Sequence, residues 1–323
     1  MTGTLPLAAD RRLGKAGGGR TIGSDANPAD PERRGGAMQQ RSIGGVHVSE
    51  IGLGAMPLSV AGRPGRQQAI DTIHAALEVG ITLVDTADAY SLGADDFGHN
   101  EELVAEALHN HPLGVDVLVA TKGGHTRAAD GSWELDGRPE HLVAACEASL
   151  RRLGVEAIGL YQLHRPDPKV PFAESVGALA ELLDAGKIRL AGVSNVDPDQ
   201  IREADAVLGG RLAAVQNEFS PRFRHSEPEL RLCAELGIAF LPWSPLGGMN
   251  GAGELGRRHR AFTEVARRHR VSPQRVCLAW MLAKAPVVVP IPGSTRPETI
   301  LDSAAAAELR LTPEEIATLD AST

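Results

Sequence analysis

Eight short apolar runs, each followed by a polar or Gly/Pro turn and then an amphipathic helical stretch, recur along most of this chain. The runs are rich in Val, Ile and Leu and lie at 51–56, 81–85, 116–121, 158–164, 188–194, 212–217, 238–244 and 287–292. Near-continuous apolar strands that alternate with helices are typical of a parallel sheet covered by helices on its faces. Eight such units fit a closed (β/α)8 barrel, whose usual length is about 250 residues. The sequence therefore predicts an α/β fold of the TIM-barrel type.

An open, doubly wound sheet is the competing topology, and a GxGxxG motif after the first strand would be its best support. The segment 52–57, Gly-Leu-Gly-Ala-Met-Pro, imitates the start of that motif. However, Pro57 stands where the third glycine should be, and no helical pattern begins until near Gln67. The closed barrel therefore remains the prediction.

The N-terminal part of the chain differs from the rest. Residues 1–38 are rich in Gly, Arg, Asp and Pro and show neither a helical nor a strand period. Such a segment cannot bury enough apolar surface to offset the entropy lost on ordering. We therefore expect a disordered N-terminal extension over 1–38 and a single barrel domain over 39–323. The alternating segment 42–51, with Gly44-Gly45 at a turn, predicts a β-hairpin at the bottom of the barrel.

Charge and composition restrict the partners and the compartment. A formal net charge of −8 argues against a chain that binds nucleic acid by neutralising phosphates. No stretch reaches the roughly 18 apolar residues of a membrane span, and the N-terminus lacks the apolar region of a signal peptide. Cys146, Cys233 and Cys277 are far apart, so they predict buried thiols in a reducing compartment and no metal site. We expect a cytoplasmic protein, monomeric or weakly homo-oligomeric, without a nucleic-acid or membrane partner.

Polar residues stand where the predicted strands end. In chain order they are Asp85, Lys122, His164, Ser194-Asn195, Gln216-Asn217 and Trp243-Ser244. Any one of them alone would be an ordinary turn residue. In a barrel, however, the carboxyl ends of all strands converge on one face, where the chemistry of such proteins lies. Together these residues predict a site at the mouth of the barrel.

Asp85, Lys122 and His164 end three consecutive strands, and Tyr90 follows Asp85 in the loop above. A phenol has a pKa of about 10 and is a weak acid near neutrality. At ~4 Å and an effective dielectric of ~20, an ammonium attracts the phenolate by ~4 kcal/mol, so we expect Lys122 to lower the pKa of Tyr90. His164 could donate a hydrogen bond to a substrate oxygen that gains negative charge. The group suits proton delivery to a carbonyl that is attacked by hydride.

A hydride must come from a cofactor, because no side chain supplies one. After the seventh strand comes a turn of small residues, Ser244-Pro245-Leu246-Gly247-Gly248. After the eighth comes Gly293-Ser294-Thr295-Arg296, which opens a helix predicted near 297–306. Phosphate sites of barrels are usually built from these two loops, and a helix N-terminus and an arginine both favour phosphate.

These segments resemble the signatures of the aldo-keto reductase family, including members similar to pyridoxal reductase. The resemblance runs from about Ile43 to the C-terminus. It lies in 85–90 (Asp-Thr-Ala-Asp-Ala-Tyr), 98–101 (Gly-His-Asn-Glu), 120–122 (Ala-Thr-Lys), 162–164 (Gln-Leu-His), 192–195 (Gly-Val-Ser-Asn), 215–216 (Val-Gln), 244–247 (Ser-Pro-Leu-Gly) and 291–293 (Ile-Pro-Gly). Each motif alone is moderately specific, but their shared order is highly specific.

The resemblance implies an NADPH-dependent oxidoreductase that reduces an aldehyde or ketone to an alcohol. Tyr90 would be the general acid, tuned by Lys122 and Asp85, and His164 would orient the carbonyl. The implied cofactor contacts are Ser194, Asn195 and Gln216 on the nicotinamide carboxamide, Trp243 on its ring, Ser244 and Leu246 on the pyrophosphate, Arg296 on the 2′-phosphate, and Asp302 near the adenine, where the family often has Glu-Asn. The two phosphate loops described above add Gly248, Gly293, Ser294 and Thr295 as predicted cofactor contacts.

Two other functions fit the same residues. One is a dehydrogenase that mainly oxidises a sugar or a pyridoxine-like alcohol. The other is a cofactor-binding regulatory subunit, as the fold provides for potassium channels. The choice of substrate depends on five loops whose shapes cannot be deduced from the sequence: 57–66, 123–138, 165–171, 218–228 and 248–260. Within them, His125 and Trp133 either line the substrate pocket or only pack against it, and Asp88 and His99 are expected to be plain loop residues.

Overall fold

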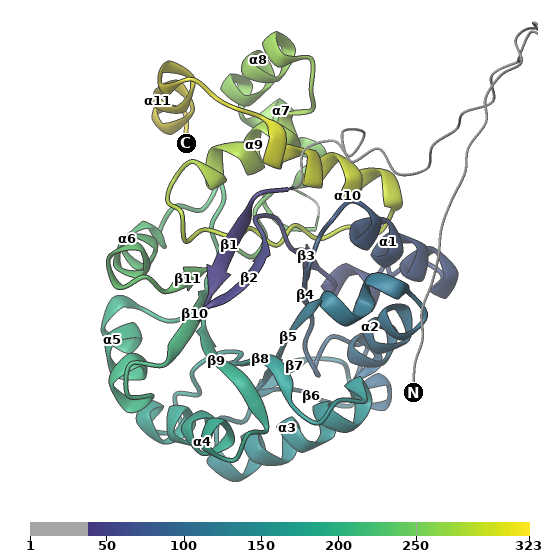
Figure 1. Cartoon of the computed structure of the whole chain (residues 1–323), viewed down its shortest axis with the longest axis vertical. Coiled ribbons are helices and arrows are strands. Elements are labelled where there is room, and N and C mark those ends of the chain that lie inside the picture. Colours follow the sequence, from purple (N-terminus) through teal and green to yellow (C-terminus); the bar gives the residue numbers. More distant parts are fainter. Residues whose placement is uncertain (1–37, 250) are drawn as a thin grey trace, which may run out of the picture. The chain divides into compact units, whose positions relative to one another are not determined.

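The computed structural model describes residues 38–249 and 251–323, so the extension expected over 1–38 lies, except for Met38, outside the described residues. The described chain is built around one parallel sheet. Its neighbours follow one another in chain order: β3 (Leu53–Gly54), β4 (Leu83–Asp85), β5 (Leu118–Gly123), β8 (Ile158–Leu163), β9 (Ile188–Ser194), β10 (Leu212–Gln216) and β11 (Ala239–Phe240). Figure 1 shows these strands curling around a common centre.

The eighth strand, predicted at 287–292, closes the sheet into a barrel. On one side, Val289 N–H donates to the carbonyl of Phe240 at 2.8 Å. On the other side, Gly52 N–H donates to Pro290 O at 2.9 Å and Gly54 N–H to Pro292 O at 3.0 Å. Because prolines lack an N–H, this seam carries only half of the usual ladder of hydrogen bonds. The (β/α)8 prediction is confirmed, and the open sheet is excluded.

Helices form a ring outside the strands (Figure 1). They are α1 (Arg66–Glu78), α2 (His99–His109), α3 (Pro139–Leu153), α4 (Phe172–Asp184), α5 (Pro198–Val207), α6 (Glu227–Leu236), α9 (Pro273–Leu282) and α10 (Pro297–Ala304), with α7 (Leu255–Arg258), α8 (Arg260–His269) and α11 (Pro313–Ala321) added near the C-terminus. Local sequence sets several ends: Asp197 and Thr312 form capping boxes, and Gly154 ends α3 with a φ of 67°. Their apolar faces pack on the sheet, where Cys146, Cys233 and Cys277 are buried as free thiols.

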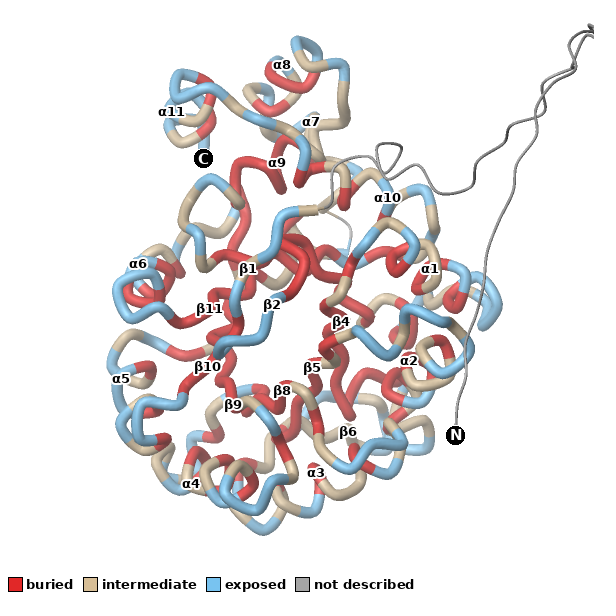
Figure 2. The backbone as a smooth tube through the Cα atoms, in the orientation of Figure 1, coloured by how far each residue is buried: buried red, intermediate tan, exposed pale blue. Residues whose placement is uncertain are grey.

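The predicted hairpin plugs the bottom of the barrel. It consists of β1 (Gln40–Ile43) and β2 (Val46–Ser49), and the turn between them has Gly44 and Gly45 at φ values of 55° and 88°. A Cβ at Gly44 would lie 2.7 Å from Leu190 and 2.9 Å from Ala213, near the first residues of β9 and β10. Strands begin at the bottom of the barrel, so the hairpin covers the end opposite the predicted site. Figure 2 shows the hairpin mostly exposed, beside strands whose residues are buried.

The barrel interior is filled by every second residue of the strands. One apolar cluster takes Leu83, Ala120, Leu160, Ala214, Leu241 and Ile291 from six strands and Ile43 and Val48 from the hairpin. Side chains in a strand alternate between its two faces, so the residue two positions further on also points inward. The residues two positions after the six strand residues of this cluster are Asp85, Lys122, Gln162, Gln216, Trp243 and Gly293. The floor of the predicted site is thus the top layer of the same core.

One element was not predicted. The segment 123–138, expected to be a loop, contains a second hairpin, β6 (His125–Arg127) paired with β7 (Trp133–Leu135). Its strands have only three residues each, which is too short for a periodicity argument to detect. Across the part of the chain that the structure describes, no helix has the length and apolar character needed to span a bilayer.

Candidate active site

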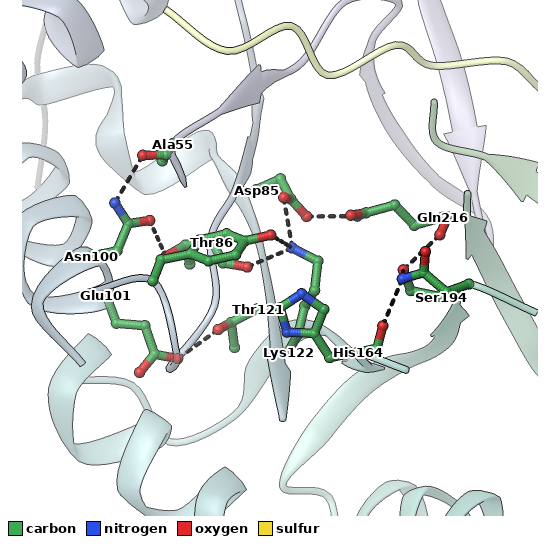
Figure 3. A network of polar contacts seen from close by, with 12 residues as sticks. Ala55, Asp85, Thr86, Asn100, Glu101, Thr121, Lys122, His164, Ser194 and Gln216 are labelled. Carbon is green, nitrogen blue, oxygen red and sulfur yellow. Dashed lines mark hydrogen bonds and ion pairs between the residues drawn. The ribbon is translucent and has the colours of Figure 1, made fainter. Parts of the chain in front are cut away.

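Lys122 is the centre of the site. Its side chain is 1% exposed, and its Nζ donates to Asp85 Oδ2 at 2.7 Å, to Thr86 O at 2.8 Å and to Tyr90 Oη at 3.0 Å (Figure 3). An ammonium has three N–H groups, and all three are used here. Burial by itself would lower the pKa of Lys122, but Asp85 and Tyr90 hold it above its ordinary value. The lysine is therefore a fixed positive charge.

The acidity of Tyr90 differs from expectation. Burial raises the pKa of the Tyr90 phenol above its ordinary value, and the opposing effect of Lys122 is smaller. Lys122 does lower this pKa, as expected, but burial of the ring, which cannot be seen in a sequence, outweighs its effect. The consequence is that Tyr90 holds its proton throughout the neutral range.

His164 lies against Tyr90, with 5.5 Å between the ring centroids. Burial, together with the positive charge of Lys122, lowers the pKa of His164 well below its ordinary value. The imidazole is thus neutral near pH 7, with one N–H to donate. This direction disfavours the alternative role that its ordinary pKa suggests for His164, that of an acid charged near neutrality.

A second group of polar residues lies beside the first. Gln216 Nε2 donates to Asp85 Oδ1 at 2.7 Å, and its backbone carbonyl accepts from Ser194 Oγ at 2.6 Å. Asn195 Nδ2 donates to Ser194 Oγ and to His164 O, each at 3.0 Å. One chain of hydrogen bonds thus joins the residues predicted to hold a nicotinamide to those predicted to handle a proton (Figure 3).

Backbone conformations mark the same region. Asn195 and Ser244 have φ values of 60° and 48°, in a region that non-glycine residues seldom adopt. The turn after Ser244 continues through Gly247 and Gly248 at φ values of 89° and 86°. A Cβ at Gly251 would lie 2.1 Å from the Gly247 carbonyl, so the turn requires glycine there. Leu246 of this turn is buried.

The loop after the eighth strand holds the remaining predicted contacts. Ser294 Oγ donates to Arg296 O at 2.9 Å, which shapes the loop before α10. Gly293, Thr295 and Arg296 are at least partly exposed, and among the described residues no carboxylate pairs with Arg296. Asp302 is already engaged, since Arg275 Nη2 donates to it at 2.7 Å. Trp243 lines the mouth, and its indole nitrogen has no partner within the described chain.

Several buried residues support the site from behind, a role that sequence reasoning did not assign to them. Asn100 is fully buried and links the Thr86 hydroxyl, at 2.6 Å, to the carbonyl of Ala55, at 2.9 Å. Glu101 accepts from Thr121 at 2.5 Å and pairs with Arg152 at 2.6 Å. Residues 98–101 of the family signature therefore position the loop that carries Tyr90. The sequence does not show that Asn100 and Glu101 are buried, so their supporting role could not be predicted from it.

Asp88 lies in a turn of the loop, as expected, but it is fully buried, and burial with the neighbouring charge of Glu101 raises its pKa well above the ordinary value. The expectation that His99 lies in a loop was wrong. His99 is the first residue of α2, and its Nδ1 lies 2.8 Å from Ser59 Oγ.

Comparison with known proteins decides the family. The Aldo/keto reductase family profile matches residues 50–323 of the chain. The chain belongs to the aldo-keto reductase family. It is thus an oxidoreductase, and it is 35% identical to the probable aldo-keto reductase 1 of Glycine max, a match covering 84% of each chain.

Solved structures of aldo-keto reductases agree with the fold. The glycerol dehydrogenase of Gluconobacter oxydans is 29% identical, with a TM-score of 0.75 over 87% of this chain and 94% of its own. An aldo/keto reductase from Klebsiella pneumoniae, solved with NADP and acetate, is 28% identical, with a TM-score of 0.72 over 88% of this chain and 95% of its own.

The bond from Gln216 to Asp85 gives a testable prediction. Gln216→Leu removes a donor from Asp85, so the surroundings of Tyr90 become more negative and its pKa should rise. If Tyr90 is the acid, as predicted, the alkaline limb of the pH profile of kcat should move upward. Gln162→Leu is the matched control, because Gln162 is also a buried interior glutamine but its amide bonds nothing within the described residues. A limb that stays in place in Gln216→Leu, or moves equally in both variants, contradicts the coupling.

Proposed function

We propose that this protein is an NADPH-dependent reductase that converts an aldehyde or ketone into an alcohol by hydride transfer, with Tyr90 as the proton donor. The observation that carries the proposal is the direction of the hydrogen bond between Lys122 and Tyr90. Lys122 donates to Tyr90 Oη at 3.0 Å, so the phenol's own proton cannot point at the lysine. It is left for a substrate oxygen at the mouth of the barrel.

The neighbours of Tyr90 support the same role. A neutral His164 can donate one hydrogen bond to the carbonyl oxygen and so hold it near the phenol. Lys122 stays charged and stabilises the phenolate that remains after proton transfer. Asp85 keeps Lys122 in place at 2.7 Å. The three groups at the mouth thus have separate roles, since Tyr90 gives the proton, His164 orients the substrate and Lys122 stabilises the product charge.

The described residues fit a nicotinamide dinucleotide. When bound, NADPH would supply the hydride that no side chain can give. Ser194, Asn195 and the free side-chain oxygen of Gln216 suit its carboxamide, and Trp243 suits its ring. Leu246, the glycines at 247 and 248 and the exposed Arg296 suit its phosphates, because small residues allow close approach and an arginine binds phosphate in bidentate fashion. We keep Asp302 as a predicted adenine contact, although it also pairs with Arg275.

The test is consumption of NADPH by the purified protein with a panel of aldehydes and ketones. Many turnovers per protein molecule support the reductase. A single slow turnover with tight cofactor binding would favour the regulatory-subunit function instead.

Oxidation of an alcohol is the second candidate, supported by the likeness to the glycerol dehydrogenase of Gluconobacter oxydans. The same residues would then act in reverse, with Tyr90 as the base. Initial rates with NADP+ and polyols, compared at neutral pH with rates of NADPH oxidation by aldehydes, decide the preferred direction.

Arg296→Ala should weaken NADPH binding while it leaves NADH nearly unaffected, because only NADPH carries a 2′-phosphate. A charge-assisted contact contributes about 1.5–3 kcal/mol, so the dissociation constant for NADPH should rise roughly 10- to 150-fold. Fluorescence titration with both cofactors measures this, with Arg267→Ala, which removes an exposed arginine of α8, as the control. Equal losses for NADPH and NADH in the Arg296 variant would show that the residue only supports the loop.

A further inference from the structure

The unpredicted β6–β7 hairpin brings two rings to the proposed acid. Arg127 pairs with Trp133 and His125 with Leu135 across the hairpin. Paired residues, and residues two apart in a strand, lie on the same face of a hairpin, so His125, Arg127 and Trp133 share one face. That face lies against the site. Measured between ring centroids, Trp133 is 6.4 Å from Tyr90 and His125 is 4.4 Å from His164.

The four rings form a continuous set. His125 and Trp133 are 5.3 Å apart and nearly perpendicular, and Tyr90 and His164 are 5.5 Å apart and also nearly perpendicular. Tyr90 and His164 are the groups proposed to touch the carbonyl oxygen. A substituent on the carbonyl carbon would therefore extend along rings rather than along aliphatic side chains.

Trp133 is held in place although it is partly open to solvent. The Arg127 guanidinium lies over the indole at 4.0 Å, and Arg127 Nη2 donates to Leu92 O at 3.2 Å in the loop that carries Tyr90. His125 Nδ1 lies 3.0 Å from the carbonyl of Glu134, which fixes the other ring. Even so, Trp133 is 45% exposed. A large ring that is anchored yet uncovered, next to an active site, is a feature of ligand-binding surfaces.

We propose that His125 and Trp133 form the binding surface for a flat aromatic group of the substrate, so that the preferred substrates are aryl aldehydes or aryl ketones. This inference rests on the proposed reductase function. Aromatic rings favour offset-stacked or edge-on contact with other rings, and such contacts add to simple burial. Arg127 is a positioning residue that keeps the indole at the angle at which it meets Tyr90.

The experiment compares benzaldehyde with cyclohexanecarbaldehyde, which have the same carbon skeleton and differ in flatness and π-electrons. The wild-type enzyme with NADPH should prefer benzaldehyde in kcat/KM. Trp133→Leu should raise the KM for benzaldehyde by about tenfold and change that for cyclohexanecarbaldehyde by no more than about twofold. Trp133→Phe should recover most of the loss. Glu134→Gln is the matched control, since Glu134 belongs to the same hairpin but to its opposite face.

Equal losses for the two aldehydes, or no loss for either, would overturn the inference. Binding is read separately, by saturation-transfer NMR in the Tyr90→Phe protein with NADP+. If that protein binds benzaldehyde in preference to cyclohexanecarbaldehyde, and loses the preference when Trp133→Leu is added, the aromatic surface is supported. A failure of turnover would then refute only the proposed reductase function. Binding without preference refutes the surface and leaves the reductase standing.

Discussion

Replacing Tyr90 by phenylalanine should lower carbonyl reduction by about 10²- to 10⁴-fold, the usual loss when a general acid is removed. The ring stays, so the contacts with Trp133 and His164 should persist, and NADPH should bind nearly as before. Lys122 loses one of its three acceptors but keeps Asp85 and Thr86. The loss should therefore appear in the chemical step rather than in cofactor affinity.

Single-turnover hydride transfer measures that step directly. His164→Gln serves as the comparison, because it removes the group that orients the carbonyl and leaves the proton donor. A rate for Tyr90→Phe within a few-fold of wild type, together with abolished reduction in His164→Gln, would show that Tyr90 is not the acid.

Lys122→Met should give a loss of the same kind, because it removes the positive charge that stabilises the phenolate. The double variant with Tyr90→Phe should be scarcely slower than either single variant, since the two side chains act as one unit. Additive losses in the double variant would mean that lysine and tyrosine contribute to separate steps.

Stability needs its own control in this experiment. Lys122→Met leaves Asp85 buried without its partner, and breaking a buried pair costs about 3–5 kcal/mol of folding free energy. Adding Asp85→Asn removes the unpaired charge. Thermal unfolding should then return toward wild type while the rate stays low, which separates a catalytic role from a structural one.

The sequence predicted the barrel and the convergence of the site well, for one physical reason. Strand residues alternate faces, so Asp85, Lys122 and Gln216 each stand two positions after an apolar interior residue, and the ends of parallel strands meet at one mouth. Knowing the strands was enough to bring these side chains together. Tyr90 lies outside any strand, and its place in the loop after Asp85 predicted it at the same mouth.

The features that sequence reasoning missed depended on burial. The pKa of Tyr90 moves upward because the ring is enclosed, and Asp88 is a buried acid within its loop. Burial raises the pKa of both groups, and the charge of Glu101 adds to the rise at Asp88. The β6–β7 hairpin was missed for another reason, because cross-strand contacts and not periodicity hold its short strands together.

The prolines of the last strand leave its join with β3 short of hydrogen bonds. Gly52 and Gly54 donate across it, but Pro290 and Pro292 cannot donate back. The chain then runs directly from Pro292 into the loop proposed to hold the phosphates. A ligand that orders this loop therefore also restrains this join, and its binding energy adds to the stability of the closed barrel. The stability of this protein against unfolding should therefore depend on how much cofactor is present, because Pro290 and Pro292 have no N–H with which to strengthen the join themselves.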